Sequence, residues 1–264
     1  MTRSSTDSDR RAAPGHPIGS VGNALEVLKM LKDMPSLRVT EAAQALGVAQ
    51  STAHRLLTTL ANHGFVTRDA KRRVYVAGPT LIELGLAALQ RGGVREQARP
   101  IIESLRDHLN ETVSIAILDG IEVLVIDAVQ PNRLVQVGPR PGHRSQAHWN
   151  ASGKALLAEL DDAELRKRYP NQKLSTATAC SIATRQSLLE EIERVRRLGF
   201  ATQFEEIEAH AGAVGAVIRD LGGQPVAALA VTGLLARIVP HVDELAVDVT
   251  RTCAEIGAAL SFSS

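Results

Sequence analysis

The hydrophobic positions of residues 40–62 fall into two helical patterns separated by Gly47. The first pattern is short and begins at Thr40, whose hydroxyl suits an N-cap, and Gly47 permits the left-handed turn that ends it. The second pattern has a buried face made by Ala53, Leu56, Leu57 and Leu60. A short helix, a glycine turn and a longer polar-faced helix are typical of a helix-turn-helix, whose second helix lies in the DNA major groove.

The polar face of the second helix carries donors, acceptors and one fixed cation. The candidates for DNA contact are Gln50, Ser51, Thr52, His54, Arg55 and Thr58. Arg55 has the planar fork that suits phosphate or guanine, and Gln50 suits adenine. The pattern leaves open which of these side chains reads a base and which holds a phosphate.

Two short strands are expected at residues 65–67 and 74–76, joined by a basic loop. The cations of this segment are Arg68, Lys71, Arg72 and Arg73. A basic hairpin after a recognition helix is a wing, placed to touch phosphates or a minor groove. The alternative is a small helical core with a solvated charged loop, but the combination of both motifs favours a winged helix.

The pattern divides the chain into four parts. Residues 1–17 lack periodicity and are expected to form a disordered arm. Residues 18–79 form the DNA-binding domain, whose first helix has the apolar positions Val21, Ala24, Leu25, Leu28 and Leu31. Residues 80–93 form a linker helix that is apolar nearly all round, which favours covering by the same helix of a second subunit over packing against its own domains only. Residues 94–264 form the second domain.

The second domain reads as α+β, with an antiparallel sheet flanked by helices. Strands are expected at residues 112–118 and 121–129, joined at Asp119-Gly120, and at 134–137, 200–204, 213–219 and 226–232. Helices are expected at residues 151–160, after Asp161, around Leu188 and along the C-terminal segment that begins near Val242.

Composition narrows the function. The net charge of the 264 residues is only +1, so DNA affinity must come from local clustering at residues 50–73. Aromatic residues make up 3% of the chain, which argues against binding of single strands by stacking. Cys180 and Cys253 form no disulfide framework or metal spacing, and neither a signal peptide nor a membrane-spanning run is recognised, so a cytoplasmic protein without membrane contact is expected.

Three segments resemble the IclR family of bacterial transcription regulators. They are A-Q-S-T-A-H-R-L-L-T-T-L-A-N-H-G-F-V with V-Y-V-A-G-P-T-L-I-E-L-G, then H-W-N-A-S-G-K-A-L-L-A, and E-E-I-E-A-H-A-G-A-V-G-A-V-I-R-D-L-G-G-Q-P-V-A-A-L-A-V-T-G. The similarity covers nearly the whole chain after residue 17. It implies a winged helix, a linker helix and a GAF-like effector domain in a homodimer or homotetramer that binds double-stranded operator DNA and responds to a small organic or aromatic acid.

The resemblance also implies an effector pocket. The positions that match the family's ligand contacts are Ala151, Ser152, Gln203 and Ala213, joined by Ala230 and Thr232, with Gly153 beside them at the start of a helix. Free N–H groups at such a helix start can hold a carboxylate. The alternatives are that Ser152 satisfies its own backbone and that Gln203 is a solvated strand residue. His210 stands where the family usually has Gly, and Val217 where Pro is common, and both changes are expected to reshape the pocket entrance.

Two other functions compete with this interpretation. For a hydrolase, Ser152 lies in N-A-S-G-K and not in G-x-S-x-G, and no paired nucleophile and acid is evident. His143, His148, His210 and His241 lack metal-ligand spacing, so neither a metal nor another cofactor is expected. A DNA-binding protein without an effector would not need so large a second domain. The sequence therefore predicts a non-enzymatic transcriptional regulator, repressor or activator, whose operator binding is modulated by a small molecule.

Overall fold

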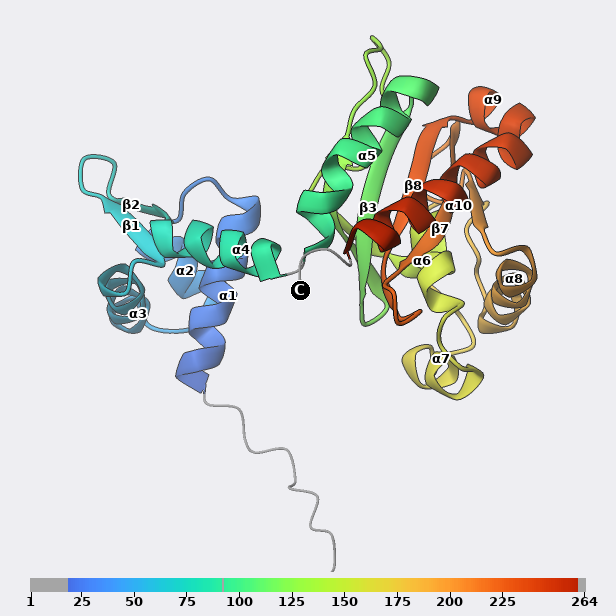
Figure 1. Cartoon of the computed structure of the whole chain (residues 1–264). Helices are drawn as coiled ribbons and strands as arrows, with labels where there is room; N and C mark the ends of the chain where they lie inside the picture. The colour runs from blue at the N-terminus through green and yellow to red at the C-terminus, as the bar shows by residue number, and fades with distance from the viewer. Residues whose placement is uncertain (1–18, 92, 261–264) are drawn as a thin grey trace, which may run out of the picture. The chain divides into compact units, whose positions relative to one another are not determined.

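The computed structural model of the chain describes residues 19–91 and 93–260 (Figure 1). The chain forms two compact units that divide within one helix, between Ala88 and Leu89. The expected disordered arm at residues 1–17 lies outside the described residues. No helix in the described ranges is both long enough and apolar enough to traverse a lipid bilayer.

The first unit is a three-helix core with a two-stranded wing. Its elements are α1 (Gly19–Asp33), α2 (Val39–Leu46), α3 (Gln50–Asn62), β1 (Val66–Asp69), β2 (Val74–Ala77) and the start of α4 (Pro79–Arg91). Leu37 pairs with Tyr75 through two backbone hydrogen bonds of 2.8 Å, which attaches the turn before α2 to the wing. Gly47 has φ 64° and ends α2 in the left-handed conformation, as expected.

Two expectations for this unit were wrong in detail. Helix α2 begins at Val39, where the Arg38 amide donates to Glu41 Oε2 at 2.7 Å, so Thr40 lies inside the first turn and does not cap it. Of the five apolar positions expected to pack in α1, Ala24, Leu28 and Leu31 do pack on the core beside the buried Val27, while Val21 and Leu25 each remain 53% exposed. Apolar residues occupy more than one face of α1, and periodicity alone did not show which face packs on α2 and α3.

The second unit is a six-stranded antiparallel sheet covered on both faces by helices. Its strand order is β5-β4-β3-β8-β7-β6. The strands are β3 (Thr112–Asp119), β4 (Glu122–Val129), β5 (Arg144–Gln146), β6 (Ala201–Phe204), β7 (Ala211–Arg219) and β8 (Pro225–Leu234). The α+β class is confirmed, because the strands pair as hairpins and the helices lie outside the sheet (Figure 1).

The sheet divides the hydrophobic core of the second unit into two layers, each covered by helices. On one face α5 (Val94–Leu109) and α10 (Val242–Ala259) pack on the sheet and bury Ile102, Ile115 and Val249 completely. On the other face lie α6 (Ala151–Leu157), α7 (Asp162–Arg168) and α8 (Arg185–Leu198), with Leu157 and Ile192 in their core. The unit is completed by the short helix α9 (Leu235–Ile238) and the 3-10 helices η1 (Ala147–Trp149) and η2 (Val239–His241).

Several sequence boundaries shift in the structure. Residues 134–137 form a loop instead of a strand, because this segment pairs with no neighbouring strand among the described residues. Leu134 is fully exposed. Just before the segment, Arg133 Nε donates to the Asn110 carbonyl at 2.7 Å. The hairpin loop between β3 and β4 is Gly120-Ile121, one residue later than expected. The helix expected at residues 151–160 ends at Leu157, and Asp161 caps α7 by accepting from the Glu164 amide at 2.7 Å.

Candidate DNA interface and ligand cavity

Helix α3 presents all six predicted contact residues to solvent. Ala53, Leu57 and Leu60 face the core, so the opposite face carries Gln50, Ser51, Thr52, His54, Arg55 and Thr58, each exposed. Thr58 Oγ1 donates to the His54 carbonyl at 2.8 Å, which leaves its oxygen as an acceptor only. Within the described chain Arg55 makes no ion pair, so its guanidinium is available to a ligand.

The wing carries Arg68 on β1 and its other three cations, Lys71, Arg72 and Arg73, on the ordered turn that follows. Asp69 Oδ1 accepts from the amides of Lys71 and Arg72, both at 3.0 Å, and this closes the loop between β1 and β2. The side chains of Arg68, Lys71, Arg72 and Arg73 are exposed. Because the described residues offer them no salt-bridge partner, their charge is free to attract phosphates.

The second unit contains a cavity of about 380 Å³ between the sheet, the start of α6 and the segments around residues 138–143 and 203–211. The strand register explains how distant residues reach it. Gln203 pairs with Ala213, which pairs with Thr232, so three strands place these side chains on one line across the sheet. Ser114 lies opposite Ala230 in the adjacent row.

Small residues make the space for this cavity. Ala213 and Ala230 each line it, and neither fills the gap beneath α6. Gly215 lies under the helix start, where a β-carbon would come within 3.0 Å of the Ser152 nitrogen. The helix therefore packs directly on the sheet at Gly215, and the hollow opens beside that contact.

Buried polar groups give the cavity its chemistry. Ser114, Ser152 and Gln203 line it and are 3%, 7% and 2% exposed. In the orientation that satisfies both ends of its amide, Gln203 Oε1 accepts from the amides of Glu205 and Glu206 at 3.2 and 2.9 Å. The Gln203 NH₂ group is then the end that can donate to a ligand.

The start of α6 has no side-chain cap. Asn150, at the N-cap position, instead donates its amide to the Gln146 carbonyl at 2.6 Å and to Ser145 Oγ at 3.0 Å. No acceptor in the described chain takes a hydrogen bond from the Ala151 or Ser152 amide. Unpaired N–H groups at a helix start carry partial positive charge, which favours an acidic group.

The structure divides the effector-binding residues that the family resemblance implied into those that line the cavity and those that do not. All of them except Gly153 line the cavity: Ala151, Ser152, Gln203, Ala213, Ala230 and Thr232. Gly153 packs against Ala147 instead. His210 and Val217 do not line the cavity: His210 has φ 64°, a conformation natural to the glycine usual there, and Val217 faces Ala155 and Val195.

Sequence reasoning missed several polar residues at the cavity. Arg140, His143 and Glu208 line it, together with Asn150. Backbone hydrogen bonds between Val125 and residues 142 and 143, at 2.8 and 3.0 Å, bring the loop to the cavity. The run Pro139-Arg140-Pro141-Gly142 indicated a loop, but no local pattern indicated where that loop packs.

An exposed recognition helix, a basic wing and a separate cavity-bearing domain define the chain as a winged-helix DNA-binding protein with a ligand-sized site. Nothing in the described residues groups three or more His, Cys, Asp or Glu side chains as a metal site would require.

Comparison with known proteins identifies the family. The family model described as "Bacterial transcriptional regulator IclR C-terminal" matches residues 86–257, and the IclR helix-turn-helix domain matches residues 20–70. The chain belongs to the IclR family of DNA-binding transcriptional regulators.

Individual relatives agree with this assignment. The HTH-type transcriptional regulator BhcR of Paracoccus denitrificans is 32% identical, over 82% of this chain and 77% of the relative. The transcriptional repressor IclR of Escherichia coli is 29% identical, over 84% and 82%. These relatives are transcriptional regulators, so homology offers no support for a hydrolase.

Solved structures show the same fold. A putative transcriptional regulator from Rhodococcus sp. RHA1 has a TM-score of 0.80 at 28% identity and covers 94% of this chain and 100% of its own. An IclR homolog from Microbacterium hydrocarbonoxydans, complexed with 4-hydroxybenzoate, has a TM-score of 0.81 at 22% identity, with coverage of 93% and 99%.

Proposed function

We propose that this regulator binds its operator through α3 and the wing, and that a small organic acid in the cavity of the second unit changes operator affinity. The observation that carries the second part is the cavity of about 380 Å³ lined by buried Ser152 and Gln203. A few polar groups that line a concave site give a ligand fixed hydrogen-bond partners, which is typical of small-molecule sites.

An acid is favoured by the balance of donors at the site. The uncapped amides of Ala151 and Ser152, the serine hydroxyls and the Gln203 NH₂ group can all donate, and Arg140 adds a fixed positive charge. Glu208 also lines the cavity and suits a hydroxyl or another donor of the ligand. The 4-hydroxybenzoate bound to the structural relative carries both kinds of group and supports an aromatic acid as one candidate.

DNA recognition is assigned to the exposed side chains of α3. Arg55 meets guanine or phosphate with its planar fork, and Gln50 pairs with adenine. The wing cations Arg68, Lys71, Arg72 and Arg73 add affinity that depends on salt and not on sequence.

A homodimer or homotetramer is proposed from the exposed apolar residues of the first unit. Val21 and Leu25 of α1 are each 53% exposed, and Ile82 and Leu84 of α4 are 65% and 53% exposed. Large apolar side chains left exposed on two helices favour a surface that a second subunit covers. Two such subunits present two recognition helices to a near-palindromic operator.

The test combines ligand binding with operator binding. Small organic acids are screened by thermal shift, and each acid that raises the melting temperature is added to a gel shift on the protein's own promoter region at constant salt. The ligand must bind one conformation more tightly than another, so operator affinity should change. Equal operator affinity with and without a saturating acid would reject the coupling and leave a DNA-binding protein without an effector.

A further inference from the structure

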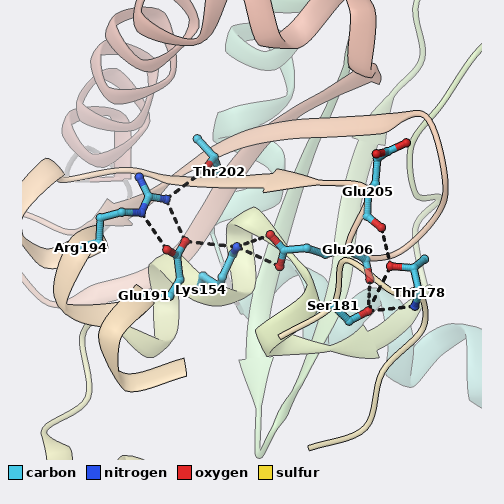
Figure 2. Close-up of polar contacts among 8 residues, drawn as sticks. All are labelled: Lys154, Thr178, Ser181, Glu191, Arg194, Thr202, Glu205 and Glu206. Atoms are coloured by element: carbon cyan, nitrogen blue, oxygen red, sulfur yellow. Dashed lines mark hydrogen bonds and ion pairs between the residues drawn. The ribbon is translucent and has the colours of Figure 1, made fainter. Parts of the chain in front are cut away.

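Lys154 is a buried charge behind the wall of the ligand cavity. Its side chain is 2% exposed and projects from α6, three residues after Ala151. Its Nζ donates to both carboxylate oxygens of Glu206, at 2.7 and 3.0 Å, and lies 3.3 Å from Glu191 Oε1 (Figure 2). A buried ammonium held between two carboxylates is costly to desolvate, so the arrangement must be kept by its surroundings.

The charges of this cluster are balanced. Arg194 forms a bidentate pair with Glu191, at 2.7 and 2.8 Å, and also donates to Thr202 Oγ1 at 3.0 Å. Burial raises the pKa of Glu206, against the opposing effect of Lys154. Burial would also raise the pKa of Glu191, but hydrogen bonds from Arg194 and the charge of Lys154 hold it below its usual value. Glu191 therefore forms ion pairs with two cations, whereas Lys154 is the one cation that forms an ion pair with Glu206 among the described residues.

Glu206 belongs to a segment that joins β6 to β7 and is fixed at several other points. Thr178 Oγ1 donates to the Glu205 carbonyl and Ser181 Oγ to the Glu206 carbonyl, both at 2.6 Å (Figure 2). Glu205 has φ 59°, a strained value for a residue with a side chain. A segment in such a conformation keeps it only if its surroundings impose it.

The same segment is a wall of the cavity. Ile207 and Glu208, which directly follow Glu206, line the cavity, as does Gln203, whose Oε1 accepts from the Glu205 and Glu206 amides. Ala151 and Ser152, on the helix that carries Lys154, also line the cavity. One ion pair therefore joins two segments that line the ligand cavity, α6 and residues 203–208, and neither of its members lines the cavity.

We propose that the Lys154–Glu206 ion pair is a positioning pair that fixes residues 205–208 as the wall of the ligand cavity and so sets ligand affinity without touching the ligand. The proposal rests on the proposed function only in its statement about ligand affinity. Buried ion pairs add little net stability, and their best attested use is to specify one arrangement over others.

The deciding experiment compares matched variants of the full chain by hydrogen–deuterium exchange without ligand. Glu206→Gln removes the charge from the wall and keeps the size of the side chain. Glu191→Gln makes the same change at the other partner of Lys154, on α8 and outside the cavity. Amides 205–211 should exchange about tenfold faster in Glu206→Gln and at the wild-type rate in Glu191→Gln, because local opening depends on local contacts.

A conservative variant separates positioning from general packing. Glu206→Asp keeps the carboxylate and should restore most of the slow exchange at residues 205–211. Melting temperatures measured in parallel show whether faster exchange is local, since a purely structural role would speed exchange throughout the second unit. The proposal is overturned if Glu206→Gln exchanges like wild type, or if Glu191→Gln opens the same segment equally.

Titration with 4-hydroxybenzoate provides the ligand measurement. Its affinity should fall about tenfold in Glu206→Gln and stay unchanged in Glu191→Gln, as expected for a coupling of ordinary size. Equal affinity in Glu206→Gln and wild type would refute the effect on the ligand. If wild type binds none of this acid, the failure belongs to the proposed ligand class, and the exchange data decide the positioning.

Discussion

Gly153 lies directly against Ala147: a β-carbon built on Gly153 would come 2.1 Å from the Ala147 carbonyl oxygen. A side chain at position 153 would therefore have to displace η1 or α6. Gly153 was expected to contact the effector because it lies beside Ser152 at the start of a helix. The structure assigns it to the close approach of two backbones, and this close approach holds the start of α6 beside the cavity.

Gly153→Ala should therefore destabilise the second unit by roughly 1–3 kcal/mol, the range expected for overpacking. The measurement is thermal or denaturant unfolding of the full chain. Gly22→Ala is the matched control, because an added β-carbon there meets no atom within 4 Å. Unchanged stability in Gly153→Ala would show that η1 and α6 separate easily.

Arg55→Ala should weaken operator binding by roughly 1–3 kcal/mol if Arg55 reads a base. The reason is the loss of a planar cation on the exposed face of α3. A gel shift at constant salt measures the effect, with Arg197→Ala, an exposed arginine of α8, as control. Affinity equal to wild type would remove Arg55 from the interface.

Arg72→Ala should weaken binding to operator and unrelated DNA alike. One released phosphate contact should reduce the slope of log K against log salt by about 1. The salt series is measured on both DNAs. A loss confined to the operator would mean that the Arg72 side chain reads sequence and does not simply meet a phosphate.

Ala213→Leu should abolish ligand binding and leave operator binding without ligand unchanged. Ala213 is 5% exposed and lines the cavity, so a larger side chain there fills the space that a ligand needs. Thermal shifts with each acid found in the screen measure the effect. Ala236→Leu makes the same change at an exposed position of α9 and should keep the shifts; an acid that still binds Ala213→Leu must bind elsewhere.

His148 should make stability sensitive to acid. Burial lowers its pKa from 6.5, the charge of Lys154 lowers it further, and the hydrogen bond to the Ser175 carbonyl opposes both. The ring of Tyr169 packs edge-on against the His148 imidazole, with 5.6 Å between the ring centroids, and adds no compensating charge. The pKa of His148 is lower in the folded than in the unfolded protein. Its neutral form therefore contributes fully to stability above pH 6.5, and this contribution is lost as pH falls through the folded pKa.

The melting temperature of wild type should thus fall more steeply below pH 6.5 than that of His148→Gln, which cannot gain the charge. His63→Gln, at an exposed histidine of the first unit, serves as control and should retain the wild-type slope. Parallel curves for wild type and His148→Gln would assign the acid sensitivity to other groups.

Local signals predicted the first unit well. The glycine turn at Gly47, the buried face of α3 and the basic hairpin each depend on residues close in the chain, and the family assignment confirmed the DNA-binding class. The predictions that failed needed knowledge of neighbours. Val21 and Leu25 have the spacing of buried residues, but the face of α1 that packs is the one that carries Val27.

The cavity was predictable only through resemblance. That route named Ser152 and Gln203, which line it, but not Arg140 or His143, which reach it through pairing of their loop with Val125. Residues 134–137 were expected to form a strand because they include apolar residues. A strand needs a neighbouring strand to pair with, and among the described residues none pairs with this segment.

By itself, the sequence determined the elements, because amphipathic periods, glycine turns and caps act over a few residues. It also determined the exposed chemistry of α3 and the wing. Only the tertiary structure decided which distant residues meet: the row of Gln203, Ala213 and Thr232, and Lys154 with Glu206, 52 positions apart. Strand register and helix packing create these meetings, and both depend on the burial of the whole core at once, which no local pattern contains.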